Sequence, residues 1–380
     1  MPGWEIIDKN EKKALASLID EGGVLMAHGL NTRRKSFHVR DFESKAKKFF
    51  KSKNALAVSS GTAAIKIALK ALGVKKGDKV ITQAFNFIAT IEAILDLDAK
   101  PIIVNVDKSL NMCPIDLEKK TNRQIKAIIP VHMLGVPVKM DKILKIAKKF
   151  KIPILEDNCE AVGAKYKKKY LCNFGQAGVA SFDHAKTITC GEGGMIFSNN
   201  KKIDKFCREY HDHGHENNPT LPRGMDSRKI YGFNFRMTEL QGVVGKVQLK
   251  KINFILNENE KRYMAIKQNL SKIIEVREIP NFSKPIFDTF IFFIKNKQQK
   301  IKIIRYLNKI GIGTKNLPDA IKWHCASYWD HALPQNEIRH SKKTLKILKQ
   351  SISIPILINK KLNLYQKIGK QISKIYLNEN

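Results

Sequence analysis

Short apolar runs rich in β-branched residues alternate with helical segments through the first two-thirds of this chain. Between the runs, apolar side chains recur at the three- and four-residue spacing of amphipathic helices. This alternation predicts an α/β fold with helices on both faces of a mainly parallel sheet. Ligands of such folds bind at the carboxyl ends of the strands, so functional residues are expected directly after the runs. The expected strands are 79–87, 101–107, 127–133, 152–158, 178–183 and 195–199, and the expected helices 63–73, 88–98 and 140–150.

The pattern changes near residue 240. Residues 238–268 are predicted to form one long helix, followed by a strand at 287–295 and a helix at 299–310. We therefore expect a large domain over residues 1–250, with an N-terminal arm or helix packed on its body, and a small C-terminal α/β domain over residues 251–380.

The charge of the chain is unusual, with 69 Lys and Arg against 35 Asp and Glu and a formal net charge of +34. Most of the basic residues are lysines scattered along the whole sequence, whereas a nucleic-acid-binding protein concentrates Arg and Lys on one face. We therefore interpret them mainly as solvated surface residues. No nucleic-acid partner is expected, although anionic metabolites fit the charge.

Targeting features and cysteine pairs are also missing from the sequence. The densest apolar run, 286–294, is interrupted by Asp288 and Thr289 and is too short to span a membrane. The beginning, MPGWEIIDKNEKK, does not resemble a secretory signal. The six cysteines are widely spaced, which argues against a zinc ribbon and a disulfide framework. We expect a cytoplasmic protein without membrane insertion and without a metal.

The strongest local feature is residues 181–194, SFDHAKTITCGEGG, in which Lys186 follows a strand and precedes a glycine-rich turn. Because the chain contains so many lysines, a surface position is the default expectation for any one of them. Its setting differs, because Gly191, Gly193 and Gly194 permit close approach of the backbone to a ligand. A lysine that forms a Schiff base must lie in a pocket where its amine can lose a proton.

Three weaker features precede it. Asp157 ends an apolar strand, where it either pairs with a cation such as a pyridinium nitrogen or caps the next helix. The segment 59–64, SSGTAA, presents small residues at a helix start, which suits a phosphate or an ordinary N-cap. Phe85 and Phe87 either stack on an aromatic cofactor or belong to the core.

In this order, the motifs SSGTAA, QAFNFIAT, LEDNCEAVGAKY, SFDHAKTITCGEGGM and GFNFRMTELQGVVGKVQL resemble the DegT/DnrJ/EryC1/StrS sugar aminotransferases. That resemblance covers nearly the whole chain. It implies a fold-type I enzyme that uses pyridoxal 5'-phosphate and works as a homodimer with shared active sites. The large domain would hold a mostly parallel sheet, and the small domain would follow it.

The resemblance also implies roles for individual residues. Lys186 would form the Schiff base, Asp157 would pair with the pyridinium nitrogen, and Phe87 would stack on the ring. The phosphate would be held by Gly61, Thr62 and Ser181, with Asn234 reaching the neighbouring subunit's cofactor. Glu160 stands where many members carry Gln against the ring hydroxyl, so altered ring electronics are expected.

Lys186 also bears on the reaction type. Some members of the family carry His in its place and act as 3-dehydratases, so the lysine favours transamination. The implied reaction has two halves, in which L-glutamate donates the amino group and a keto- or aldehydo-sugar accepts it. A dehydratase and a non-catalytic basic binding or regulatory protein remain the alternatives.

Further motifs bear on the acceptor sugar. MPGWEI, VHMLG with KMDKI after it, DHGH (212–215) and the tryptophans and histidines of 323–331 resemble the branch that aminates 8-oxo-Kdo. Its product is 8-amino-3,8-dideoxy-manno-octulosonate, for surface polysaccharide. A nucleotide-linked 4-keto-6-deoxy sugar, as in perosamine synthases, is the alternative acceptor.

Substrate contacts are expected from His213, Arg236 and His324. Residues 211–215, HDHGH, place three histidines at the two-residue spacing of one strand face. No partner cluster accompanies them, so we interpret this segment as an active-site loop or a subunit contact and not as a metal site. Arg236 suits a bidentate contact to a substrate anion or a brace of the dimer.

Overall fold

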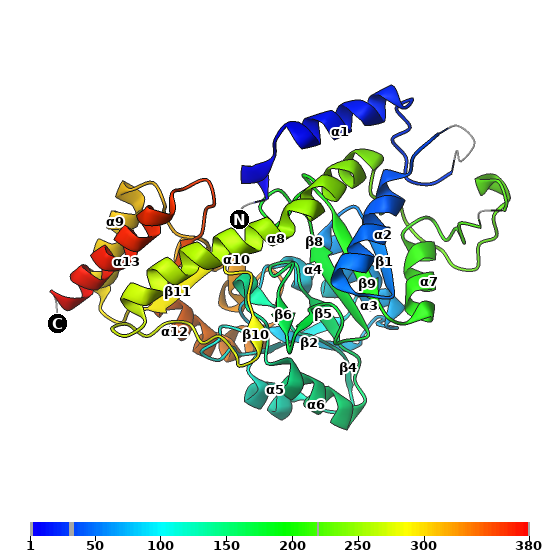
Figure 1. Cartoon of the computed structure of the whole chain (residues 1–380). Coiled ribbons are helices and arrows are strands. Elements are labelled where there is room, and N and C mark those ends of the chain that lie inside the picture. The colour runs from blue at the N-terminus through cyan, green and yellow to red at the C-terminus, as the bar shows by residue number, and fades with distance from the viewer. Residues whose placement is uncertain (1–2, 30–33, 219, 379–380) are drawn as a thin grey trace.

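The computed structural model describes residues 3–29, 34–218 and 220–378 (Figure 1). Its main layer is a long sheet made of two adjoining parts, β3–β2–β4 and β5–β8–β9–β1. Parallel bridges join the parts, one from Ile128 to Ile154 and one from Val131 to Asp157. The strands are β3 (Lys100–Val104), β2 (Lys79–Gln83), β4 (Ile125–Ile129), β5 (Leu155–Asp157), β8 (Ala177–Ser181), β9 (Gly194–Ser198) and β1 (Asn54–Val58).

Strand direction agrees with the expectation of a mainly parallel sheet. β2 pairs in parallel with β3 and β4, and β5 pairs in parallel with β8. β9 is the exception, because it runs antiparallel to both β8 and β1. All six strands expected from the sequence are present, whereas β1, which lies outside the expected runs, forms an edge of the sheet.

Helices cover both faces of the sheet, as predicted. Along β1 the side chains alternate, so that Leu56 and Val58 pack toward α3 (Gly61–Ala71) and α7 (Lys201–Tyr210). Ala55 and Ala57 point the other way, toward α2 (His38–Phe50) and α8 (Glu239–Leu270). Further helices on the large sheet are α4 (Ala89–Leu95), α5 (Pro114–Lys120) and α6 (Met140–Phe150).

The long helix α8 links the sheet layer to the C-terminal part. Thr238 and Gln241 form a capping box at its beginning, and the helix continues without interruption to Leu270. Its far end packs on α13 (Leu362–Leu377) beside the antiparallel pair β11 (Thr289–Phe293) and β12 (Ser351–Pro355). The expected boundary at residues 250 and 251 falls inside α8 and stays a prediction.

The N-terminal segment packs on α8, as expected for an arm or helix on the body (Figure 1). Glu11 is buried and accepts hydrogen bonds from Gln248 and Lys251 of α8, each at 2.8 Å. The remaining elements are η1 (Trp4–Ile6), α1 (Lys9–Asp20), η3 (Met133–Gly135), β6 (Lys165–Tyr166), β7 (Lys169–Tyr170), η4 (Arg223–Met225), β10 (Ser283–Lys284), α9 (Lys297–Lys309), α10 (Ile321–His324), η5 (Ala326–Tyr328), α11 (Gln335–His340) and α12 (Lys342–Gln350).

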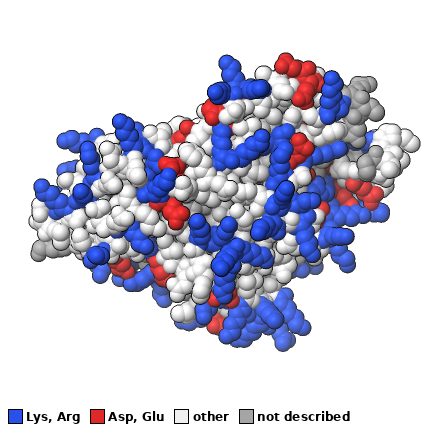
Figure 2. All heavy atoms as spheres, in the orientation of Figure 1, with Lys and Arg blue, Asp and Glu red and all other residues white. Residues whose placement is uncertain are grey.

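Basic side chains are spread over the face seen in Figure 2, with only scattered acids among them. This distribution agrees with solvated surface lysines and shows no single concentrated patch on that face. Within the described ranges, no helix combines the length and the apolar character needed to cross a membrane.

Candidate active site

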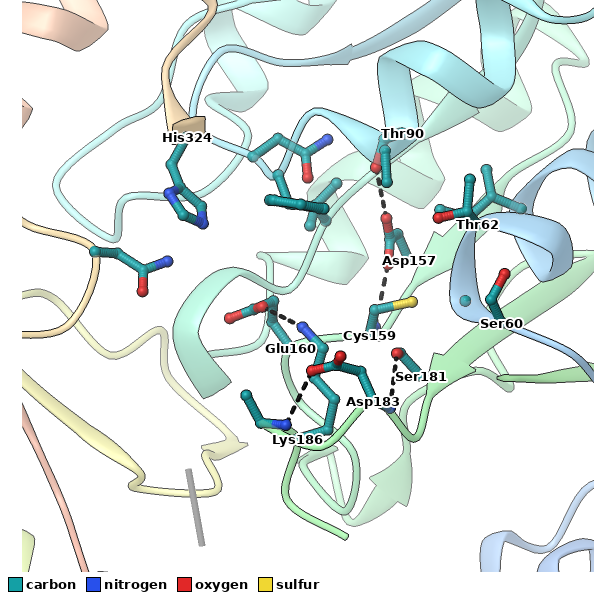
Figure 3. Close-up of a pocket in the computed structure, with 18 of the residues that line it drawn as sticks. Ser60, Thr62, Thr90, Asp157, Cys159, Glu160, Ser181, Asp183, Lys186 and His324 are labelled. Carbon is teal, nitrogen blue, oxygen red and sulfur yellow. Dashed lines mark hydrogen bonds and ion pairs between the residues drawn. The ribbon is translucent and has the colours of Figure 1, made fainter. Parts of the chain in front are cut away.

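A pocket of about 680 Å³ opens at the carboxyl ends of the central strands (Figure 3). Each wall follows a strand, as expected: Thr62 lies after β1, Phe87 after β2, Asp157 at the end of β5 and Lys186 after β8. Residues 314–316 and His324 close the pocket from the C-terminal part. Eight of the residues singled out from the sequence line it, namely Gly61, Thr62, Phe87, Asp157, Glu160, Ser181, Lys186 and His324.

Lys186 and Glu160 form an ion pair within this pocket, with 2.6 Å between Nζ and Oε1. Both side chains are largely buried. Burial alone would lower the pKa of Lys186, but the carboxylate of Glu160 raises it above its ordinary value. Burial alone would raise the pKa of Glu160, yet Lys186, assisted by Lys315, lowers it to about 2. Lys186 is therefore an ammonium group until the pair is broken.

Asp157 is buried on the opposite side of the pocket. Its Oδ2 accepts a hydrogen bond from Thr90 Oγ1 at 2.8 Å, and its Oδ1 accepts one from the backbone N–H of Cys159 at 3.1 Å. These two donors fix the carboxylate at the pocket wall, where it suits a cationic ring nitrogen. Asp157 ends a strand and does not cap a helix, since residues 158–164 hold no helix.

The beginning of α3 forms a cradle for an anion. Ser60 caps the helix through its Oγ, which accepts from the N–H of Ala63 at 3.0 Å. The N–H groups of the first helical residues, Gly61 and Thr62, have no intrahelical acceptor and carry the positive end of the helix dipole. A Cβ at Gly61 would lie 2.9 Å from the Cβ of Ser181, so glycine lets the helix approach this serine.

Two of the three glycines after Lys186 are in close contact with other parts of the chain. A Cβ at Gly194 would stand 2.2 Å from the carbonyl oxygen of Ser60, and one at Gly193 would stand 2.7 Å from the Sγ of Cys190. Gly194 therefore permits β9 to approach the α3 cradle. Gly193 leaves room for Cys190, and neither of these two glycines lines the pocket itself.

Phe87 and His324 lie together at the pocket mouth, with ring centroids 5.6 Å apart. Phe87 is 43% exposed although it is a large apolar side chain, so its ring is available to a ligand, whereas Phe85 belongs to the core. His324 Nδ1 donates to the carbonyl of Ala320 at 2.8 Å, which leaves Nε2 free to face the pocket. Burial lowers the pKa of His324.

Asn234, Arg236 and His213 do not line the pocket of their own chain. Asn234 bridges to Asp212 in an isolated antiparallel pair, and Arg236 forms an ion pair with Asp212 at 2.6 Å. His213 has a positive φ of 54°. These residues lie together in the segment that follows α7.

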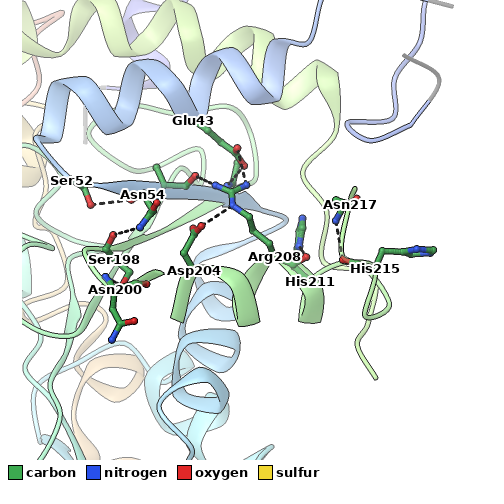
Figure 4. A network of polar contacts seen from close by, with 12 residues as sticks. Glu43, Ser52, Asn54, Ser198, Asn200, Asp204, Arg208, His211, His215 and Asn217 are labelled. Atoms are coloured by element: carbon green, nitrogen blue, oxygen red, sulfur yellow. Dashed lines mark hydrogen bonds and ion pairs between the residues drawn. The ribbon is translucent and has the colours of Figure 1, made fainter. Parts of the chain in front are cut away.

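Residues 211–215 form a turn and not a strand, in agreement with a loop at this position. His211 caps the end of α7 and the chain then turns, so that His211 and His215 point in different directions (Figure 4). His211 Nδ1 donates to the carbonyl of Arg208, and its Nε2 lies 3.2 Å from Nε2 of His28. Across the described part of the chain, no group of three or more His, Cys, Asp or Glu side chains could hold a metal ion.

Sequence reasoning missed Lys315, Thr90 and Asn86 at this pocket. The sequence indication for Thr90 was its position in α4, one turn after Phe87. Its hydroxyl donates to Asp157 at the end of β5. Nothing local distinguishes Lys315 from the other lysines of the chain.

Comparison with known proteins agrees with this geometry. Residues 9–373 match the profile of the DegT/DnrJ/EryC1/StrS aminotransferase family. The chain belongs to this family. It is accordingly a sugar aminotransferase that depends on pyridoxal 5'-phosphate.

Individual relatives and structures are similar over large parts of the chain. A GDP-perosamine synthase of Escherichia coli O157:H7 is 33% identical over 257 residues, which is 67% of this chain and 68% of the relative. A pleiotropic regulatory protein of Geobacillus stearothermophilus is 28% identical over 89% of both chains. The crystal structure of an aminotransferase from Psychrobacter cryohalolentis has a TM-score of 0.86 and 24% identity over 99% of both chains, which shows the fold.

The residues of the pocket fit the cofactor. Glu160 Oε2 and Asn86 Nδ2 are buried and have no hydrogen-bond partner among the described residues, so the pocket holds polar atoms suited to a polar ligand. The α3 cradle suits its phosphate, Asp157 its ring nitrogen, the exposed face of Phe87 its ring, and Lys186 its aldehyde.

Proposed function

We propose that this aminotransferase moves the amino group of L-glutamate to the aldehyde of 8-oxo-Kdo and so forms 8-amino-3,8-dideoxy-manno-octulosonate. The observation that supports amino transfer most strongly is the pairing of Lys186 with Glu160 across a pocket that also holds buried Asp157. The choice of sugar is supported by the likeness of residues 323–331 to the 8-oxo-Kdo branch, since His324 of this stretch lines the pocket.

Each side chain of the pocket has its own role in this reaction. When bound, pyridoxal phosphate serves as an electron sink for the charge left on a substrate carbon after deprotonation. Asp157 holds the proton on the ring nitrogen, and the α3 cradle with Ser181 binds the phosphate. The amine of Lys186, freed when the amine of L-glutamate replaces it on the cofactor, would move a proton from the α-carbon of L-glutamate to C4′ of the cofactor. In the second half-reaction it would move a proton from C4′ to C8 of the sugar.

The homodimer with shared sites belongs to the same proposal. Its support is the position of Asn234, Arg236 and His213 outside the pocket of their own chain, which leaves them available to a partner's site. Subunit complementation tests it: Lys186→Ala and Asn234→Ala proteins are inactive alone but regain activity when their subunits are exchanged. Persistent inactivity of the mixture, with exchange verified by a tag, would remove Asn234 from the neighbouring site.

A nucleotide-linked 4-keto-6-deoxy sugar is the second candidate acceptor, because the GDP-perosamine synthase of Escherichia coli O157:H7 is 33% identical over 67% of this chain. One experiment separates the two. L-Glutamate first converts the protein to its aminated form, in which the bound cofactor carries the amino group. This form is freed of glutamate and mixed with 8-oxo-Kdo or with GDP-4-keto-6-deoxymannose. We expect 8-oxo-Kdo to restore the visible band of the cofactor. Restoration by the GDP sugar alone would transfer the assignment to the second candidate.

A further inference from the structure

Two polar residues interrupt the most apolar stretch of the chain, and the reaction described above does not use them. Asp288 precedes β11 and Thr289 begins it, and they are 0% and 3% exposed. A buried carboxylate is costly unless a cation and further donors satisfy it. These two buried polar side chains therefore need a cationic partner within the C-terminal core.

That partner is Lys315, which comes from a distant part of the chain. Its Nζ donates to Asp288 Oδ2 at 2.8 Å and to Thr289 Oγ1 at 3.0 Å. The hydroxyl of Thr289 in turn donates to Asp288 Oδ1 at 3.1 Å. The lysine side chain is only 13% exposed, so this triad holds it in one position.

The backbone around the triad is fixed as well. The N–H of Lys315 donates to the carbonyl of Ser353 in β12 at 3.1 Å. Gly135, the glycine of the VHMLG motif, packs against Asp288 with a positive φ of 79°. A Cβ there would lie 2.9 Å from Asp288 Oδ1 and 2.5 Å from a carbon of Ile286, so the motif leaves room for the triad.

Lys315 faces the active-site pocket. An ammonium group has three donors, of which the described residues accept two, and the group lines the pocket together with Thr314, Asn316 and His324. Its charge reaches the catalytic end of the pocket, because it helps to lower the pKa of Glu160 and that of His324. The ammonium group of Lys315 is thus a fixed cation at the pocket, with one donor left for a ligand.

We propose that Lys315 is the anchor for the anionic group of the acceptor sugar, with Asp288 and Thr289 as its positioning residues. This inference rests on the proposed function, which supplies an acceptor that carries an acid. Lys186 cannot take this part because it is committed to the reaction. An Arg236 that reached the pocket from a neighbouring subunit would bring Asp212, its ion-pair partner, with it. The matching ligand group is a carboxylate, as in a sugar acid, or a phosphate, as in a nucleotide sugar.

Calorimetric titration of the protein in its aminated form tests the anchor without any turnover. The ligands are Kdo, its methyl ester, which lacks the negative charge, and GDP-mannose. We expect Lys315→Gln to weaken the binding of Kdo tenfold to a hundredfold, as for a lost charge-assisted hydrogen bond, and to leave the binding of the ester unchanged. Lys315→Arg retains the charge and should recover most of the affinity.

The control is Lys322→Gln, which removes an exposed lysine from a neighbouring helix. Weakening of GDP-mannose binding alone by Lys315→Gln would support the anchor with phosphate as its anion and would overturn the sugar-acid assignment. The proposal fails if Lys315→Gln and Lys322→Gln bind every ligand alike. It also fails if only the half-reaction with L-glutamate responds, since the lysine would then serve the donor.

Discussion

The ion pair between Glu160 and Lys186 makes a prediction about how the apoprotein takes up its cofactor. Only a neutral amine attacks an aldehyde, and Glu160 holds Lys186 as an ammonium at 2.6 Å. Replacing Glu160 with Gln keeps the size of the side chain but removes its charge. Burial then dominates and lowers the pKa of Lys186, so a larger fraction of the amine is neutral at pH 7.5.

The expected acceleration of cofactor uptake follows from the carboxyl group of Glu160. Its pKa moves from the ordinary 4.5 to about 2, although burial alone would raise it. Such a displacement corresponds to about 3 kcal/mol, or roughly a few hundredfold in the protonation equilibrium. Because Lys315 and His324 contribute part of it, we expect Glu160→Gln to accelerate cofactor uptake by at least about tenfold at neutral pH.

Stopped-flow absorbance of the apoprotein mixed with pyridoxal phosphate between pH 6 and pH 10 measures this rate. The wild-type rate should still be rising with pH at the upper end, whereas the rate of Glu160→Gln should level off at a lower pH. Glu192→Gln is the matched control, because Glu192 also lines the pocket but forms no ion pair with Lys186. Equal rates and equal pH profiles for wild type and Glu160→Gln would refute the reasoning.

Four further changes have defined outcomes. Lys186→Ala should abolish turnover while circular dichroism and melting temperature stay near wild type, and substantial residual transamination would contradict its role. Asp157→Ala should weaken cofactor retention in equilibrium dialysis by at least about tenfold, since it removes the partner of the ring nitrogen; unchanged retention and rate would remove Asp157 from that role. Gly3→Ala should lower kcat with little change in stability, because its Cβ would stand 2.6 Å from the carbonyl oxygen of Lys186; Trp4→Ala, an exposed neighbour, is the control. Burial lowers the pKa of His28 to about 3 and that of its contact His211 to about 4, so both side chains stay neutral in the folded protein. Their contribution to stability is complete above pH 6.5 and is lost as the pH falls. The melting temperature should therefore decrease between pH 6.5 and pH 4, and His28→Gln should reduce that decrease.

The strands and the catalytic edge could be predicted from the sequence because they depend on local pattern and one topological rule. β-branched runs alternating with helical periods identified β2, β3, β4, β5, β8 and β9. The carboxyl ends of parallel strands share an edge, which explains why Asp157 and Lys186 line the same pocket. Strand direction is not encoded in periodicity, so the antiparallel course of β9 could not be predicted.

Other features depend on contacts between distant parts of the chain. Asp288 was visible as a polar interruption of an apolar run, but its partner Lys315 lies 27 residues away and carries no local signature. The two-residue spacing of the HDHGH segment suits a strand face as well as a turn, so spacing alone could not define its conformation. The segment was interpreted as a loop or a subunit contact, and it forms a turn, which the positive φ of His213 and Gly214 produces. The domain boundary and the roles of individual site residues stay predictions.

The absorption spectrum of the purified protein, recorded before and after addition of L-glutamate, tests the central claim most directly. We predict a visible band from the cofactor bound to Lys186, its loss with L-glutamate, and its return when 8-oxo-Kdo is added. A protein that shows no band even after incubation with excess pyridoxal phosphate, or whose band does not respond to L-glutamate, would contradict the account.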